Sequence, residues 1–114
     1  MADRLVELIV ADAAATNGII LGEVLIGCRT KEQFQRVRRQ MGALTRLGVT
    51  EKTLESAAIL GFDLRRAGVV VNLPDLVIAA SAIEHGAMLM HADSDFDLMA
   101  QHCDLKVESY VSAV

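Results

Sequence analysis

The sequence predicts an α/β fold in which helices pack on a small, mostly parallel sheet, and two observations support this prediction. Hydrophobic residues make up 53% of the chain and aromatic residues only 4%, so the core must be built from aliphatic side chains. Apolar runs of strand length also alternate with runs at helical spacing. This alternation is typical of parallel sheets with helical connections, which place their sites at the carboxyl ends of strands.

The first part of the chain predicts three helices and short strands. Residues 3–9 read as a short helix or as the tail of a longer one, and residues 13–19 are ambiguous, with a brief strand as one interpretation. Residues 18–27 predict a very apolar helix. Thr30 is a candidate N-cap for an amphipathic helix, because apolar residues then recur at helical spacing. Residues 47–49 predict a short strand.

The middle of the chain predicts two longer helices with clear boundaries. Thr50 is suited to cap a helix that Gly68 ends. Pro74 is suited to the first turn of the next helix, which continues to a stop at Gly86. These boundary residues fix the positions of both helices.

The last part of the chain predicts a strand, a helix and a strand. Residues 87–90 predict a short buried strand. Ser94 begins a helix that extends to about residue 101, with Asp97 placed for a contact like that of a capping box. Residues 106–110 predict the final strand.

Length and composition predict one domain over residues 1–114. The chain is long enough to bury a core, and it contains one proline, no repeat and no low-complexity linker. Every apolar run is shorter than the roughly 20 residues that cross a bilayer, and no secretory signal is recognisable, so no membrane association and a cytoplasmic location are expected. Cys28 and Cys103 match no metal-ligand spacing and receive no function.

The charge of the chain is unevenly distributed. Its net charge of −4 argues against general attraction to nucleic acid. Basic residues nevertheless gather in residues 29–46, where a solvated helix face and an RNA-binding patch are alternative interpretations. The basic residues are Arg29, Lys31, Arg36, Arg38, Arg39 and Arg46.

Several carboxylates occupy unusual positions. Glu23 is surrounded by aliphatic residues with no base at helical pairing distance, so it must reach water, a distant arginine or a metal ion. Asp75 lies in the first turn of a helix, where the helix dipole alone would explain it. Asp93, Asp95 and Asp97 follow a strand within five positions, more acids than one cap requires. Such oxygen ligands suit Mg²⁺ or Mn²⁺, which can activate water for phosphodiester cleavage.

The histidines are less informative. His85 and His102 lie at predicted helix C-termini, where a structural role accounts for both. His91 lies between a strand and Asp93, so orienting a carboxylate or contacting substrate is an alternative to a structural role. The chain contains no HExxH, GxxxxGK[ST] or GxSxG motif.

Two segments resemble the PIN domain of VapC-type toxins, and together they cover nearly the whole chain. Residues 73–97 contain a proline-aspartate helix start, then His85-Gly86, a short strand and an Asp-x-Asp-Phe motif that ends at Phe96. Residues 16–27 are similar to the family's second acidic motif, with Glu23 as its glutamate.

The resemblance implies a PIN-like α/β/α sandwich that hydrolyses RNA at an acidic site binding Mg²⁺ or Mn²⁺. By position, Glu23, Asp75 and Asp93 match the metal-binding acids, and Asp95 matches the supporting acid before phenylalanine. Asp97 is left as a cap. The resemblance further implies a VapB-type antitoxin as partner and a homodimeric state.

The sequence departs from the family at its start. PIN domains open with a hydrophobic strand that ends in an aspartate, and residues 8–12 imitate it only superficially, because Asp12 lies too close to Glu23 for the intervening helices. Residues 3–10 are therefore expected to match the helix before the second motif. The fold would then lack its first strand, through truncation, a misassigned start codon or gene decay. Exposed strand edges would favour dimerisation, and one lost carboxylate would weaken ion binding.

Three functional hypotheses follow. The first is a PIN-type endoribonuclease, and the second is a catalytically impaired remnant that binds an antitoxin or itself. Strong binding of Mg²⁺ or Mn²⁺ by Glu23, Asp75 and Asp93 would exclude the simplest form of the second. The third, a receiver-like domain, predicts an acidic pair after the first strand and a lysine after the last, and neither is evident.

Overall fold

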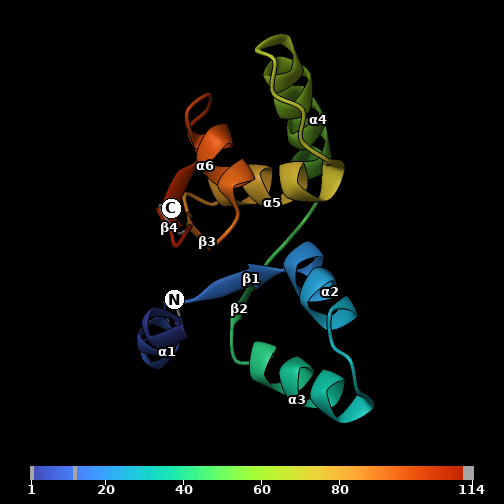
Figure 1. The fold of residues 1–114 in the computed structure, drawn as a ribbon, viewed down its shortest axis with the longest axis vertical. Helices are drawn as coiled ribbons and strands as arrows, with labels where there is room; N and C mark the ends of the chain where they lie inside the picture. The colour runs from blue at the N-terminus through green and yellow to red at the C-terminus, as the bar shows by residue number, and fades with distance from the viewer. Residues whose placement is uncertain (1, 12, 112–114) are drawn as a thin grey trace. The chain divides into compact units, whose positions relative to one another are not determined.

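The computed structural model describes residues 2–11 and 13–111 as helices, strands and connecting turns (Figure 1). Asp12, the residue of the superficial N-terminal match, lies outside the described residues. The chain divides into two compact units, residues 1–48 and residues 49–114. The assignment of both units to one domain stays a prediction.

The first unit combines helices with one pair of parallel strands. The strands pair from Ala15 with Thr45 to Asn17 with Leu47. Thr30 caps α3 as predicted, since its side chain accepts a hydrogen bond from a backbone N–H at the start of that helix. The cap of α2 is Asn17, which was not identified from the sequence and accepts hydrogen bonds from two backbone N–H groups. The elements are α1 (Ala2–Val10), β1 (Ala15–Asn17), α2 (Gly18–Ile26), α3 (Lys31–Met41) and β2 (Thr45–Leu47).

The second unit contains two packed helices followed by a strand, helix and strand (Figure 1). α4 packs along α5, and α5 in turn contacts β3. The second strand pair is also parallel, with Met88 beside Lys106 and His91 beside Ser109. The elements are α4 (Glu51–Arg66), α5 (Leu73–Glu84), β3 (Met88–His91), α6 (Ser94–Ala100) and β4 (Lys106–Ser109).

The buried apolar residues of the described chain belong to the second unit. α5 is the central helix, because seven consecutive residues, 76–82, are buried. An apolar helix without a polar face is expected to lie inside a domain, and α5 does. The buried apolar side chains are Ala57, Leu64, Val69, Leu76, Val77, Ile78, Ala79, Ala80, Ala82, Phe96, Met99 and Leu105.

The start of α4 is fixed to the end of α5. Thr50 and Thr53 form a capping box at the N-terminus of α4. The Thr53 hydroxyl is fully buried and lies 2.6 Å from a carboxylate oxygen of Glu84, near the end of α5. Glu84 therefore also places its negative charge at the N-terminus of α4, where the helix dipole stabilises it.

The predicted α/β class with parallel strands is confirmed, while some element boundaries differ. The strand expected at residues 47–49 lies at Thr45–Leu47, because β1 pairs with those residues and Val49 leads into the cap of α4. The strand expected at residues 87–90 lies at Met88–His91 and is buried only at its end. Cys28 and Cys103 are free. No described helix is long and apolar enough to cross a membrane.

A buried hydroxyl in α5 offers a test of the core. The Ser81 side chain is fully buried, and its oxygen has no hydrogen-bond partner among the described residues. Ser81→Ala should therefore leave the free energy of unfolding unchanged or raise it by up to about 1 kcal/mol, because an unsatisfied hydroxyl is costly and alanine favours helix. Thermal unfolding of the variant measures the change in stability. Ser56→Ala, at an exposed position of α4, is the matched control. A clear loss of stability at position 81 alone would contradict it.

Candidate metal centre

Asp75 is held in the first turn of α5. The Asn72 side chain caps the helix, and its Oδ1 accepts a hydrogen bond from the Asp75 backbone N–H at 3.2 Å. Pro74, which has no N–H to satisfy, occupies the same turn. The Asp75 side chain is half-buried. Its carboxylate is thus fixed by a helix start that is specified locally by Asn72 and Pro74.

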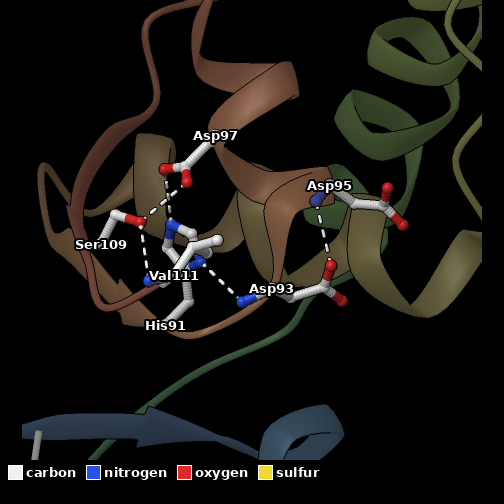
Figure 2. A network of polar contacts seen from close by, with 6 residues as sticks. All are labelled: His91, Asp93, Asp95, Asp97, Ser109 and Val111. Atoms are coloured by element: carbon white, nitrogen blue, oxygen red, sulfur yellow. Dashed lines mark hydrogen bonds and ion pairs between the residues drawn. The ribbon is translucent and has the colours of Figure 1, made fainter. Parts of the chain in front are cut away.

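Asp93 and Asp95 lie in the turn between β3 and α6. Asp93 is the N-cap of α6, and its Oδ1 accepts a hydrogen bond from the Asp95 backbone N–H at 2.9 Å (Figure 2). Both side chains are exposed. The prediction that acids follow this strand and begin the next helix is therefore confirmed.

The two helix starts bring three predicted site residues together. Asp75, Asp93 and Asp95 each offer a carboxylate oxygen, and these three oxygens lie within 4.8 Å of one another. Oxygens on opposite sides of an octahedral Mg²⁺ are about 4.2 Å apart, since each bond is about 2.1 Å. At most one pair of the three can be opposite, and adjacent oxygens on such an ion are about 3.0 Å apart, so the carboxylates would need to close by up to about 2 Å or to bind through retained waters. The all-oxygen character of the set is what suits a hard divalent cation.

Glu23, the fourth predicted site residue, belongs to the first unit. It lies on α2, where Asn17 Oδ1 accepts from the N–H groups of Ile19 and Ile20 at 3.0 Å each. Asn17 is itself only 3% exposed, so the helix start is firmly held. The Glu23 carboxylate is exposed. This exposure gives the carboxylate access to water, one of the three environments that the sequence allowed, and its predicted metal-binding role stays a prediction.

Asp97 is not a cap, and that prediction is wrong. Asp93 caps α6, so Asp97 falls one turn into the helix and its carboxylate is used elsewhere. Its Oδ1 lies 3.1 Å from His91 Nε2, and its Oδ2 accepts a hydrogen bond of 2.7 Å from the Ser109 hydroxyl (Figure 2). Ser109 was not identified from the sequence. The only signal was its place in the last strand, next to His91 once the strands pair.

The other histidine contacts are structural. His85 is the C-cap residue of α5, and its Nδ1 lies 2.8 Å from the backbone oxygen of Ser81, which satisfies a carbonyl in the last turn. His102 follows α6, and its backbone N–H donates to the Met99 oxygen. Both residues lie at helix C-termini as predicted, and the ring contact of His85 agrees with the structural role expected for that residue.

Comparison with known proteins identifies the family. The family model described as the PIN domain matches residues 1–101. The chain is 34% identical over 90 residues to the VapC ribonuclease Mb1587 of Mycobacterium bovis, an alignment that covers 77% of this chain and 67% of that protein. It is also 35% identical over 94 residues to ribonuclease VapC51 of Mycobacterium tuberculosis, covering 79% and 66%.

Solved structures agree on the fold. A chain of the VapBC2 structure from Rickettsia felis, bound to a promoter DNA fragment, superposes with a TM-score of 0.77 at 24% identity, covering 95% of this chain and 83% of that one. A chain of VapBC-1 from nontypeable Haemophilus influenzae gives a TM-score of 0.68 at 19% identity, covering 84% and 73%. The chain therefore belongs to the PIN domain family and, within it, to the group of VapC ribonucleases.

Proposed function

We propose that this protein is a metal-dependent endoribonuclease of the VapC toxin type, which hydrolyses RNA phosphodiester bonds at a carboxylate-bound Mg²⁺ or Mn²⁺ ion. The observation that carries the proposal is that carboxylate oxygens of Asp75, Asp93 and Asp95 lie within 4.8 Å of one another. Asp75 begins one helix and the other two acids begin another, so the cluster does not arise from a single cap. Membership in the VapC ribonuclease group supports the same activity.

The role of the cation follows from the charge of the site. Three adjacent carboxylates would repel the phosphates of RNA, so the cluster favours that substrate only when a cation neutralises it. A bound divalent ion would polarise a phosphoryl oxygen and lower the pKa of a coordinated water. Asp75 and Asp93 would hold the ion, and Asp95 would support it. Glu23 is proposed as the further metal-binding acid, on its match to the family motif.

The RNA substrate would require positive charge to offset the acidic protein. The basic side chains within residues 29–46 are exposed, and α3 carries most of them. They are available to contact phosphates, as the RNA-binding interpretation of this segment requires. A VapB-type antitoxin is the proposed protein partner, because the matched solved structures include VapBC complexes. A homodimer is the proposed state.

RNA cleavage with and without a divalent ion tests the proposal. The chain should cut RNA in Mn²⁺ or Mg²⁺ and stop when EDTA is added. Asp75→Asn should lower the rate of cleavage by at least about 100-fold, because it removes a negative charge that would hold the catalytic divalent ion. Asp63→Asn, an exposed acid of α4 outside the cluster, is the matched control and should leave the rate unchanged. Equal cleavage by wild type and Asp75→Asn would refute the assignment of this site.

The alternative is a catalytically impaired protein that binds an antitoxin or a second copy of itself. Exposed apolar side chains such as Phe62, at 63% exposure on α4, give this alternative some support. It predicts no cleavage by the chain, with or without metal. A version extended by an N-terminal strand that ends in aspartate separates the two hypotheses further. Cleavage only by that version would favour an enzyme that needs a further carboxylate.

A further inference from the structure

His91 is a buried imidazole with both ring nitrogens engaged. The side chain is 4% exposed and lies at the end of β3. The Asp93 backbone N–H donates to His91 Nδ1 at 3.1 Å (Figure 2). Nδ1 must therefore be the unprotonated nitrogen, so the ring proton lies on Nε2 and is donated to Asp97 Oδ1 at 3.1 Å. These two contacts define one tautomer and one ring orientation.

Neighbouring elements fix the other members of this network. The Ser109 hydroxyl reaches Asp97 from β4, whose residue Ser109 pairs with His91 in the parallel register. The Phe96 ring lies against the imidazole, with ring centroids 5.3 Å apart and planes tilted by 57°. Phe96 is 7% exposed. The imidazole is thus held on its face and at both nitrogens.

The same geometry favours a positioning role for His91 over direct chemistry. A general base needs an accessible, unprotonated nitrogen, but Nδ1 is occupied by the Asp93 N–H. The Ser109 hydroxyl donates to Asp97 rather than to His91, so the three side chains do not form a nucleophile-base relay. What remains is the effect of His91 on the residue whose backbone it binds.

We infer that His91, held by Asp97 and Ser109, is a positioning residue that orients Asp93 toward the metal centre. The functional part of this inference, metal binding by Asp93, rests on the proposed function. Asp93 is held at its backbone N–H by His91, and at its carboxylate Oδ1 by the Asp95 N–H. These two contacts hold the residue at its backbone and at Oδ1, and they leave Oδ2 available as a metal ligand. Partners of this kind tune metal affinity although they do not touch the metal.

Two substitutions at position 91 separate this role from simple packing. Asparagine can restore the contact to Asp93, because an asparagine side-chain oxygen readily accepts from the N–H two residues later, as in an Asx-turn. Glutamine can reach Asp97 in place of Nε2 but leaves the Asp93 N–H without its acceptor. Both variants lose the ring contact to Phe96, so both should lose similar folding stability. They form a matched pair.

The expected results concern the metal-free protein and its Mn²⁺ affinity. By NMR, the wild-type ring should show the Nε2-protonated tautomer, and the Asp93 amide should be protected from exchange in wild type and His91→Asn but not in His91→Gln. By calorimetry, His91→Gln should bind Mn²⁺ about 10–100-fold more weakly than wild type, with His91→Asn close to wild type. Urea unfolding checks that the two variants are equally stable.

The outcomes distinguish this inference from the proposed function. An Nδ1-protonated ring, or equal Asp93 protection in the two variants, would overturn the positioning role. Equal Mn²⁺ affinity of the two variants, with clear binding by wild type, would overturn it as well. Absence of Mn²⁺ binding by wild type would instead count against the proposed metal centre. The amide and tautomer results would then still decide whether His91 positions Asp93.

Discussion

Asp93→Asn is expected to remove most of the stabilisation of this protein by Mn²⁺ while leaving the metal-free protein close to wild-type stability. Asparagine caps a helix about as well as aspartate, so the hydrogen bond from the Asp95 N–H to position 93 is retained. The negative charge is lost from a cluster whose three oxygens lie within 4.8 Å. The substitution thus removes a carboxylate charge from the proposed metal centre and spares the start of α6.

The expected magnitude follows from mass action. Loss of a residue that only holds a metal ligand weakens metal binding by about 10–100-fold. Loss of a direct ligand should cost more, so Mn²⁺ binding should weaken by at least about 100-fold. At a Mn²⁺ concentration 100 times the wild-type dissociation constant, stabilisation should fall from about 2.7 to about 0.4 kcal/mol. The metal-free free energy of unfolding should change by less than about 1 kcal/mol, because the cap survives.

Thermal unfolding across a Mn²⁺ titration measures both effects. Asp63→Asn removes an exposed acid of α4 with the same change of net charge, and it should keep the full Mn²⁺ response. If Asp93→Asn and Asp63→Asn respond equally to Mn²⁺, ion binding at the cluster is excluded. If Asp93→Asn unfolds easily without metal, the side chain acts chiefly as a structural cap.

Phe96→Ala is expected to lower the free energy of unfolding by about 3–5 kcal/mol, the usual cost of removing a buried aromatic ring. Phe96 is 7% exposed, and its ring also lies against His91, so the cavity would open beside the network that holds Asp93. Because proteins of this size are only marginally stable, this loss is a large fraction of the total.

Urea unfolding followed by circular dichroism measures the loss, since the chain contains no tryptophan for fluorescence. Leu98→Ala on the same helix is the control. Leu98 is 40% exposed, so its truncation should cost about 1 kcal/mol or less. Similar losses for the two variants would mean that the Phe96 ring is not part of the core.

Local sequence signals predicted most helix starts. Thr30 and Thr50 cap the helices they were expected to cap, and Pro74 lies in the first turn of α5. These signals succeed because a cap depends on residues within one turn. Short strands were placed less well, because the position of β2 depends on its pairing with β1, a segment some 30 positions earlier.

The candidate site was predicted only in part for the same reason. Acids at strand ends and helix starts identified Asp75, Asp93 and Asp95, whose convergence the structure describes. Asp97 was misassigned because the better-placed Asp93 took the cap and left Asp97 for partners elsewhere in the fold. Its contact with Ser109 spans 12 positions and exists only when β3 and β4 pair in register.

The short spacing of the contacts around Asp93 has a consequence for folding kinetics. The contacts of Asp93 with His91 and Asp95, and of His91 with Asp97, span at most six positions. Closing such short loops has a small entropic cost and is fast, so this part of the centre can form as soon as the turn after β3 does. Asp75 must wait for the core to pack around α5. Cation binding should therefore accelerate folding little and chiefly slow unfolding, because the full set of ligands exists only late.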